Sequence, residues 1–375
     1  MSDMSYLEKL LDGVEVEWKT LGSIAELKRG TSITKKDVID GTIPVVAGGR
    51  TPAYYHNTSN RDGQTIVIAG SGAYAGFVSW WEEPIFVSDA FTVKPHNILL
   101  PRYCYHFLMN MQQQLHEFKS GGGVPHVYPR DVSPILIPIP CPDTPEKSLA
   151  IQSEIVRILD KFTALTAELT AELNMRKKQY NYYRDQLLSF KEGEVEWKTL
   201  GEVAQFKRGT AITQKQTTPG EIPVVANGPI PTYFHSESNR QGETIVIARS
   251  GAYAGYVSFW DQPIFLTDAF SVHSDLKIVK PKFIYHVLQN KQEHIHAMKK
   301  GAGVPHVRVK EFETYDIPIP PITEQERIVS ILDKFDTLTN SITEGLPREI
   351  ELRQKQYEYY RDLLFSFPKP ETVSK

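Results

Sequence analysis

The chain has 375 residues with 42 basic and 45 acidic side chains, and its 41% of apolar residues predicts two or three folded domains rather than a disordered chain. Two cysteines, no apolar run as long as a membrane span and a first segment without the order of a signal peptide indicate a cytoplasmic protein with no membrane association. The formal net charge of −3 excludes a histone-like coat of positive charge but is compatible with a local basic groove.

Taken in chain order, the sequence contains two copies of one unit. Residues Glu15–Gly22 recur at Glu194–Gly201, and 33 of the 49 ungapped positions are identical between Ile43–Phe91 and Ile222–Phe270. A period this long indicates a duplicated domain rather than a solenoid. We therefore predict the following segments: an N-terminal helical segment (1–12), a first strand-rich domain (13–142), a long helix (143–192), a second strand-rich domain (193–321), a second long helix (322–367) and a tail (368–375).

Short β-branched runs such as Thr65–Ala69, separated by Gly and Asn turns, predict the strands of each domain. A helix is expected after Pro101 and again after Pro281, because proline is favoured at the first helical position. The expected fold class is α+β, with two duplicated strand-rich domains held apart by two long antiparallel coiled-coil helices in a pseudo-twofold arrangement.

The two long helices are predicted from heptad spacing of apolar residues. The pattern runs from Ile151 to Phe190 with one stutter and without Gly or Pro. The second copy holds four extra residues near Gly345–Pro347, where a break or kink is expected. A stripe this narrow favours pairing of the two helices, although each helix could instead pack on its own domain. The segment Tyr6–Leu11 is expected to dock near the C-terminal helix.

The sequence offers little evidence of catalysis. It lacks a phosphate-binding loop, a nucleophile elbow and a zinc-binding helix motif. Glu17–Lys19 and Glu196–Lys198 resemble half of a metal-dependent nuclease site, but a strand at the start of each domain explains them equally well. His116, His294 and His296 are interpreted as solvated residues rather than metal ligands. No catalytic residue and no metal site are therefore expected.

Loops of both copies carry cations, aromatic rings and hydrogen-bonding groups at matching places. Lys and Arg neutralise phosphates, whereas Arg, Asn and Tyr reach the edges of bases in the grooves. Each residue alone could be an ordinary solvated loop residue, but the duplication of the whole set favours DNA contact. The candidates of the first copy are Lys28, Arg29, Tyr54, His56, Arg61, Ser71, Tyr74, Lys119, His126, Tyr128 and Arg130. Those of the second copy are Lys207, Arg208, Tyr233, His235, Arg240, Arg249, Ser250, Tyr253, Lys300, His306, Arg308 and Lys310.

The two copies share most of these groups, so the DNA target is expected to have nearly palindromic halves. The differences are concentrated at a few positions, of which Gly70 against Arg249 is the sharpest. An arginine there could bind guanine through two hydrogen bonds, contact only phosphate, or pair with an acid such as Asp268.

The layout resembles the specificity subunit of type I restriction-modification enzymes. The resemblance rests on the Ile-Pro-Ile-Pro stretches at Ile137–Pro140 and Ile317–Pro320, on Thr323–Val329, and on the related helical segments Lys178–Asp185 and Lys355–Asp362. The tandem Thr-Ala-Glu-Leu pair at Thr166–Leu173 resembles a feature of one branch of that family. Copy one departs from copy two at Pro142–Lys147, which leaves the start of the first long helix open.

The resemblance implies a subunit without catalysis of its own. Each domain would read one half of a split double-stranded DNA sequence, and the helices would set the spacer and dock two methyltransferase subunits, with two restriction/translocase subunits completing the complex. S-adenosylmethionine, ATP and magnesium would belong to those partners, so no cofactor is expected in this chain. Two other functions remain open at this point: a free-standing DNA-binding regulator, and a protein-interaction scaffold that binds no nucleic acid.

Overall fold

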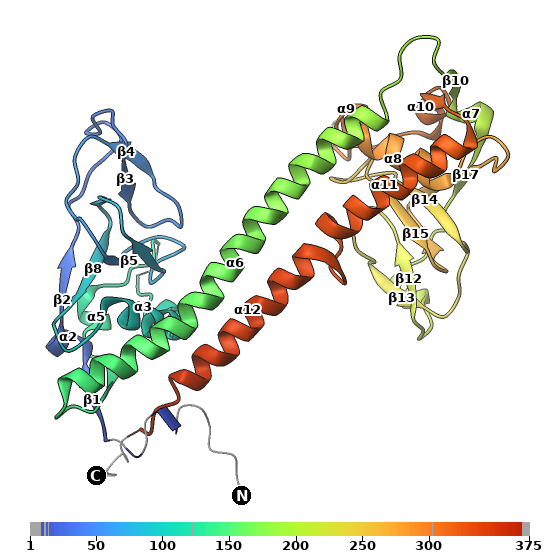
Figure 1. Cartoon of the computed structure of the whole chain (residues 1–375). Coiled ribbons are helices and arrows are strands. Elements are labelled where there is room, and N and C mark those ends of the chain that lie inside the picture. The colour runs from blue at the N-terminus through green and yellow to red at the C-terminus, as the bar shows by residue number, and fades with distance from the viewer. Residues whose placement is uncertain (1–8, 11–12, 14, 122, 302, 370–375) are drawn as a thin grey trace, which may run out of the picture. The chain divides into compact units, whose positions relative to one another are not determined.

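The computed structural model in Figure 1 describes residues 9–10, 13, 15–121, 123–301 and 303–369. The chain divides into two compact units. Unit 1 comprises Met1–Leu169 and Ile350–Lys375, and unit 2 comprises Thr170–Glu349. Each unit contains one copy of the sequence repeat, and the predicted duplication of a strand-rich domain is therefore present in the fold.

The first repeat folds into short strands followed by short helices. Its elements are β1 (Val16–Thr20), α2 (Leu21–Ile24), β2 (Ala25–Arg29), β3 (Ile43–Val46), β4 (Tyr54–His56), β5 (Thr65–Ala69), β6 (Val78–Trp81), β7 (Phe86–Val87), β8 (Ala90–Pro95), α3 (Pro101–Asn110), α4 (Gln112–Glu117), α5 (Pro129–Val132) and β9 (Leu136–Pro140). Proline occupies the start of α3 as predicted, because its fixed φ suits the first helical turn.

The second repeat has the same succession of strands and helices with one added 3₁₀ turn. Its elements are β10 (Glu196–Thr199), α7 (Leu200–Val203), β11 (Ala204–Arg208), η1 (Gln214–Gln216), β12 (Ile222–Val225), β13 (Tyr233–His235), β14 (Glu243–Ala248), β15 (Val257–Asp261), β16 (Phe265–Leu266), β17 (Ala269–Ser274), α8 (Pro281–Asn290), α9 (Gln292–Ala297), α10 (Val309–Glu313) and β18 (Asp316–Ile319).

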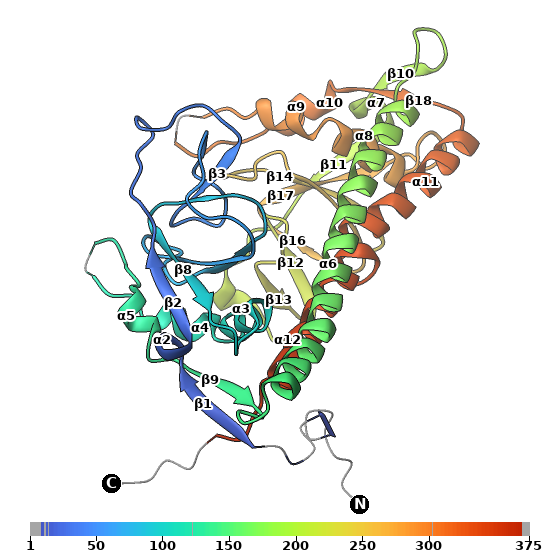
Figure 2. The same ribbon diagram turned by 60° about the vertical axis from the view of Figure 1, so that its left-hand side comes forward.

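Each repeat builds three sheets with the same strand order. The largest is antiparallel, with the order β2-β8-β5-β6 in unit 1 and β11-β17-β14-β15 in unit 2. A second sheet has the order β4-β3-β7 or β13-β12-β16. The first strand of each repeat pairs with its last, β1 with β9 and β10 with β18. This pairing closes the repeat, so that β9 leads directly into the following helix (Figure 2).

In the part of the chain that the structure describes, three long helices complete the fold: α6 (Pro145–Leu187), α11 (Ile322–Asn340) and α12 (Gly345–Leu364). Each unit also uses a long helix to complete its hydrophobic core. In unit 1, Ile68 of β5 and Tyr103 of α3 share a buried cluster with Ile155 of α6. In unit 2, Ile247 of β14 shares a buried cluster with Ile328 of α11. Packing of each helix on its own domain, the alternative left open by the sequence, therefore also occurs.

Beyond the domain cores, the helices pair with each other within each unit. In unit 1 the ring of Phe162 in α6 stacks on Tyr360 of α12, with centroids 5.3 Å apart. In unit 2 Tyr180 and Tyr183 of α6 both stack on Phe335 of α11, at 6.0 and 5.7 Å. In each unit the paired helices run in opposite chain directions (Figure 1). The predicted antiparallel pairing is thus confirmed within the units.

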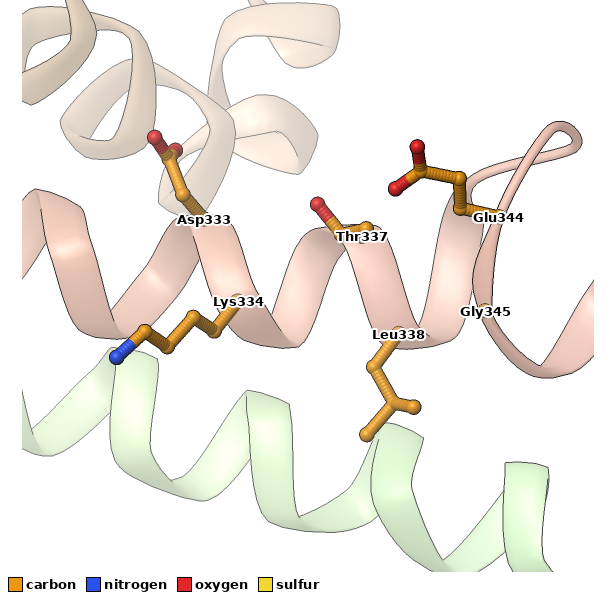
Figure 3. Close-up of a pocket in the computed structure, with 6 residues that line it drawn as sticks. All are labelled: Asp333, Lys334, Thr337, Leu338, Glu344 and Gly345. Carbon is orange, nitrogen blue, oxygen red and sulfur yellow. The ribbon is translucent and has the colours of Figure 1, made fainter.

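The second long helix is broken at the place where copy two has four extra residues. Helix α11 ends at Asn340, and α12 begins at Gly345, which has a φ of +76°. A Cβ at Gly345 would collide with the backbone carbonyl oxygens of Thr337 and Leu338, so only glycine fits the return of the chain. In Figure 3, Lys334 and Leu338 point toward α6, whereas Asp333 points away from it. The break leaves a shallow pocket lined by Asp333, Lys334, Thr337, Leu338, Glu344 and Gly345.

The predicted N-terminal helical segment, residues 1–12, lies outside the described residues apart from Lys9 and Leu10, of which Leu10 packs against the core of unit 1. Within the described part of the chain, no helix combines the length and the apolar character needed to cross a membrane.

Candidate nucleic-acid interface

Loops far apart in the sequence form one surface in unit 1. We call this the loop surface of unit 1 and define it as residues 28–31, 48–51, 70–76, 119–121 and 123–130. The backbone N–H of Gly72 donates to Pro125 O at 2.9 Å, and that of Val127 donates to Gly70 O at 3.0 Å. The ammonium group of Lys119 donates to Ala73 O at 2.8 Å. These bonds tie the loop after β5 to the loop before α5.

The clearest group of cations on this surface surrounds Tyr128. The guanidinium of Arg29 lies 5.4 Å from the centre of the Tyr128 ring, and that of Arg130 lies 4.7 Å from it. The His126 ring stacks on the same tyrosine, with centroids 5.7 Å apart and planes 5° from parallel. Arg29 is exposed and the Arg130 side chain is 77% exposed. Two accessible cations held beside stacked rings can neutralise phosphates and approach base edges.

A further cation on this surface belongs to a residue outside the predicted set. The Arg50 guanidinium lies 4.9 Å from the Tyr74 ring centre and 5.5 Å from that of Phe77. Tyr74, which was predicted, remains 42% exposed. The second repeat has Pro229 at the position of Arg50, so this cation is specific to unit 1.

Unit 2 builds the equivalent surface from the same backbone contacts. The loop surface of unit 2 comprises residues 207–210, 227–230, 249–255, 299–301 and 303–310. Gly251 N donates to Pro305 O and Val307 N donates to Arg249 O, both at 2.9 Å. Lys299 donates to Ala252 O at 2.8 Å and is therefore the structural counterpart of Lys119. The predicted Lys300 instead forms an ion pair with Glu311 at 2.9 Å while its side chain stays 70% exposed.

A carboxylate lies at the base of each loop surface. In unit 2, Asp268 accepts a hydrogen bond from Ser250 at 2.7 Å and another from Asn227, and its second oxygen lies 3.8 Å from Arg249. Burial alone would raise the pKa of Asp268, but these two hydrogen bonds and the Arg249 charge outweigh it and hold that pKa below its usual value. The pairing of Arg249 with an acid, one of the alternatives left open by the sequence, is thus the arrangement in this structure.

Two predicted arginines make their side-chain hydrogen bonds inside the domains, and their contact with DNA stays a prediction. Arg61 donates to Thr92 Oγ1 at 3.1 Å and to the carbonyl oxygens of Asn60 and Arg29 at 2.7 and 2.9 Å. Its counterpart Arg240 makes the equivalent bonds, including one to Arg208 O at 2.8 Å, and burial lowers its pKa. Their guanidinium groups hold the end of β2 or β11 in place, where the exposed cations stand.

The predicted histidines of β4 and β13 are also structural. His56 and His235 are each 6% exposed. The backbone N–H of Ile39 donates to His56 Nδ1, and that of Thr218 donates to His235 Nδ1, both at 3.0 Å. These rings anchor the loop that precedes β3 or β12, and little of either side chain is accessible.

The predicted Tyr54 and Tyr233 lie two residues before these histidines and are partly buried. The hydroxyl of Tyr233 donates a hydrogen bond to Ile212 O at 2.9 Å. Their neighbours Tyr55 and Phe234 are instead 55% exposed. The alternation of side chains along a strand could have indicated this difference. Ser71 and Ser250 are likewise occupied, because each donates its hydroxyl to the carboxylate of its unit.

The remaining predicted residues fall into two groups. His126, Tyr128 and His306, together with Lys119, are partly buried members of the loop surfaces. The exposed members are Lys28, Arg29, Tyr74, Arg130, Lys207, Arg208, Arg249, Tyr253, Lys300, Arg308 and Lys310. These side chains are the ones the geometry leaves accessible for contact with a polyanion.

His116 of α4 and His296 of α9 brace the loops, whereas His294 of α9 is exposed as predicted. His116 Nδ1 lies 2.9 Å from Ala75 O, and His296 Nδ1 lies 3.1 Å from Ala254 O. Among residues 9–10, 13, 15–121, 123–301 and 303–369, His, Cys, Asp and Glu side chains form no group of three that could hold a metal ion.

Comparison with known proteins identifies the family. A family model described as the type I restriction modification DNA specificity domain matches residues 13–176 and 192–352. The specificity subunit of the type I restriction enzyme EcoR124I/EcoR124II of Escherichia coli is 45% identical over an alignment that covers 100% of both chains. A putative type I restriction enzyme specificity subunit of Haemophilus influenzae is 34% identical, with 98% of this chain and 99% of the relative covered.

A solved structure supports the same assignment at the level of the fold. The S subunit of a type I restriction-modification system from M. genitalium aligns with 98% of this chain and 100% of its own, with a TM-score of 0.72 and 20% identity. The duplicated family match and the full-length relatives show that the chain belongs to the specificity subunits of type I restriction-modification systems and that its two repeats are target-recognition domains.

Proposed function

We propose that residues 13–142 and 193–321 each read one half of a bipartite double-stranded DNA target. The observation that carries this proposal is the repetition of one loop framework with exposed cations in both units. Arg29 and Arg208 end equivalent strands, and Arg130 and Lys310 stand at equivalent places beside the loops before α5 and α10. One loop surface can contact a single stretch of duplex DNA, and two loop surfaces can contact two separate half-sites.

The target is proposed to be nearly palindromic. The loops that build both surfaces share Ser-Gly-Ala-Tyr-Ala-Gly at Ser71–Gly76 and Ser250–Gly255, and Val-Pro-His-Val at Val124–Val127 and Val304–Val307. Equal loops on equal frameworks make equal contacts. Two such domains related by a twofold axis would each meet one strand in the same orientation.

The long helices are proposed to set the length of the unspecified spacer and to dock two methyltransferase subunits. The tandem tetrapeptides Thr166–Leu173 lie within the continuous helix α6, where added residues change helix length. Tyr182 and Tyr359 project from the helices with 61% and 64% of their surface exposed, which suits a protein partner. Assembly with restriction/translocase subunits would complete the complex in the cytoplasm.

Catalysis is proposed to reside in those partners, which would also bind S-adenosylmethionine, ATP and magnesium. A free-standing regulator or a scaffold without DNA would require none of these partners. Full-length similarity to specificity subunits supports the proposed complex over both of these functions.

The direct experiment is a DNA mobility-shift titration of the chain assembled with its methyltransferase subunits, repeated at several salt concentrations. Replacing Arg29 or Arg208 by alanine should weaken binding and reduce the slope of log K against log salt by about 1, because one phosphate contact is lost. Lys94 provides a matched control, since it is exposed near the opposite end of β8 from Arg29's partner Phe91. Equal effects of Arg29→Ala and Lys94→Ala would contradict the proposed surface.

A further inference from the structure

The two loop surfaces carry the same carboxylate in two different electrostatic environments. Asp89 and Asp268 occupy equivalent positions just before β8 and β17, and each accepts a hydrogen bond from the serine of its own unit. The difference in charge lies in the residue after β5 or β14. Unit 1 has Gly70 at this position, and unit 2 has Arg249.

In unit 1 the carboxylate is open. Asp89 is an exposed residue, and among the described residues its only side-chain partner is the hydroxyl of Ser71, which uses one of the two oxygens. Arg50, a cation of a neighbouring loop in unit 1, is stacked on Tyr74. A negative acceptor is therefore presented between the loops of unit 1.

In unit 2 the same place presents a cation. Arg249 lies 3.8 Å from Asp268, and both side chains remain about half exposed, at 53% and 44%. An exposed pair at this distance contributes little and is readily exchanged for another partner. Asp268 would keep its bonds from Ser250 and Asn227 if Arg249 turned to a ligand. Unit 2 thus presents the hydrogen-bond donors of Arg249 where unit 1 presents the acceptor oxygens of Asp89.

We propose that positions 70 and 249 set the base pair at which the two half-sites differ. In unit 1, Asp89 accepts a hydrogen bond from the exocyclic amino group of a cytosine in the major groove. In unit 2, Arg249 leaves Asp268 and donates two hydrogen bonds to O6 and N7 of a guanine at the equivalent position. Both pairings follow from the donor and acceptor patterns of the base edges. The inference rests on the proposed reading of half-sites and adds the residues responsible for their asymmetry.

The backbone makes these two positions exchangeable. Gly70 O accepts from Val127 N at 3.0 Å, and Arg249 O accepts from Val307 N at 2.9 Å, so the two residues make the same backbone contact. A Cβ on Gly70 would lie 3.1 Å from Asp89 O, which requires a shift of a few tenths of an ångström. The neighbouring position is different, because a Cβ on Gly48, the counterpart of Asn227, would meet Ser71 O at 2.5 Å. The test variants therefore exchange only the residues at positions 70 and 249.

The test selects bound duplexes from a library with randomised half-sites, using the full chain assembled with its methyltransferase subunits. Arg249→Gly should lose the guanine preference in one half-site by roughly 5- to 150-fold and shift that position toward cytosine. Gly70→Arg should give the other half-site a guanine preference, and Arg249→Lys should retain a weakened one. The other positions of both half-sites should stay unchanged, and Lys94→Ala should select the wild-type target.

The inference is overturned if Arg249→Gly weakens binding equally on all sequences, since Arg249 would then be a phosphate contact. It is also overturned if both exchanges leave the selected bases unchanged while thermal unfolding shows that the variants are folded. If Arg249→Gly fails to fold, the argument that the backbone tolerates either residue at this position is contradicted. Selection with Arg249→Lys then tests the role of the charge. If the wild-type assembly selects no bipartite sequence, the proposed function itself fails, and the inference fails with it.

Discussion

A buried histidine connects each target-recognition domain to its long helix, and its loss gives a sharp test of the packing. His106 of α3 is fully buried, and its Nε2 lies 2.7 Å from Asp160 of α6. The same carboxylate accepts from Arg102 at 2.8 Å, and His106 Nδ1 lies 3.1 Å from the Tyr357 hydroxyl of α12. Burial opposes ionisation of Asp160, but the bonds from His106 and Arg102 outweigh it and lower its pKa.

Replacing Asp160 by alanine should destabilise unit 1 by about 1–3 kcal/mol, because the Nε2–H of His106 would remain buried without an acceptor. Arg102 would keep its cation–π contacts with Trp80 and Tyr105, both at 4.8 Å, so its share of the loss should be small. Asp160→Asn keeps an acceptor and should lose less stability. The measurement is the free energy of unfolding of the full chain by urea titration.

The second unit supplies a matched variant. Asp333 of α11 lies 2.8 Å from His286 Nε2 and 2.7 Å from Lys282, so Asp333→Ala should produce a similar loss in unit 2. A free energy of unfolding within about 0.5 kcal/mol of the wild type for both alanine variants would refute the reasoning, because changes of that size are typical of unconstrained surface sites.

Four further predictions follow from the same structure. Burial holds the pKa of His106 below its ordinary value of 6.5, so near that pH the unfolded chain binds a proton that the folded chain does not. The free energy of unfolding should therefore fall as the pH drops through 6.5, and it should fall less in His106→Gln. Urea unfolding at about pH 7.5 and 5.5 measures both. Arg61→Ala should lower stability by about 2 kcal/mol without changing the bases selected, because its bonds are internal; a changed target sequence would contradict this. One more Thr-Ala-Glu-Leu after Leu173 adds about 6 Å and a net rotation of about 40°, so methylation mapping should show a spacer longer by one to two base pairs with unchanged half-sites; altered half-sites would exclude the helix as ruler. The chain free of partner subunits should neither cleave nor methylate DNA, and activity in such a preparation would refute a non-catalytic role.

The features predicted correctly from the sequence are those that depend on local spacing or on the internal repeat. The heptad spacing from Ile151 to Phe190 gave α6 nearly its full length, because burial of one face at each turn needs apolar residues every three or four positions. The break before Gly345 was signalled by glycine followed by proline, and the structure shows why glycine is required there. Self-similarity alone predicted two equivalent domains.

The roles of individual loop residues could not be predicted in the same way, because they depend on contacts distant in sequence. Arg61 reads as a free cation, yet it binds carbonyl oxygens of Asn60 and of Arg29, 32 positions away. His106 gave no signal, since its partner Asp160 lies 54 positions later on another helix. Asp89 was not among the predicted residues, because only its place beside Ser71 between the loops, which depends on the fold, suggests a base contact.

The central claim is that each repeat reads one half of the target, and sequencing of methylated sites tests it most directly. DNA from cells that carry this chain with its methyltransferase subunit should be methylated at one bipartite sequence, whose halves are nearly related by a twofold axis and are separated by a spacer without sequence preference. A contiguous methylated sequence without such a spacer would contradict the reading of one half by each domain, and two half-sites with no twofold relation would contradict the proposed near-palindrome.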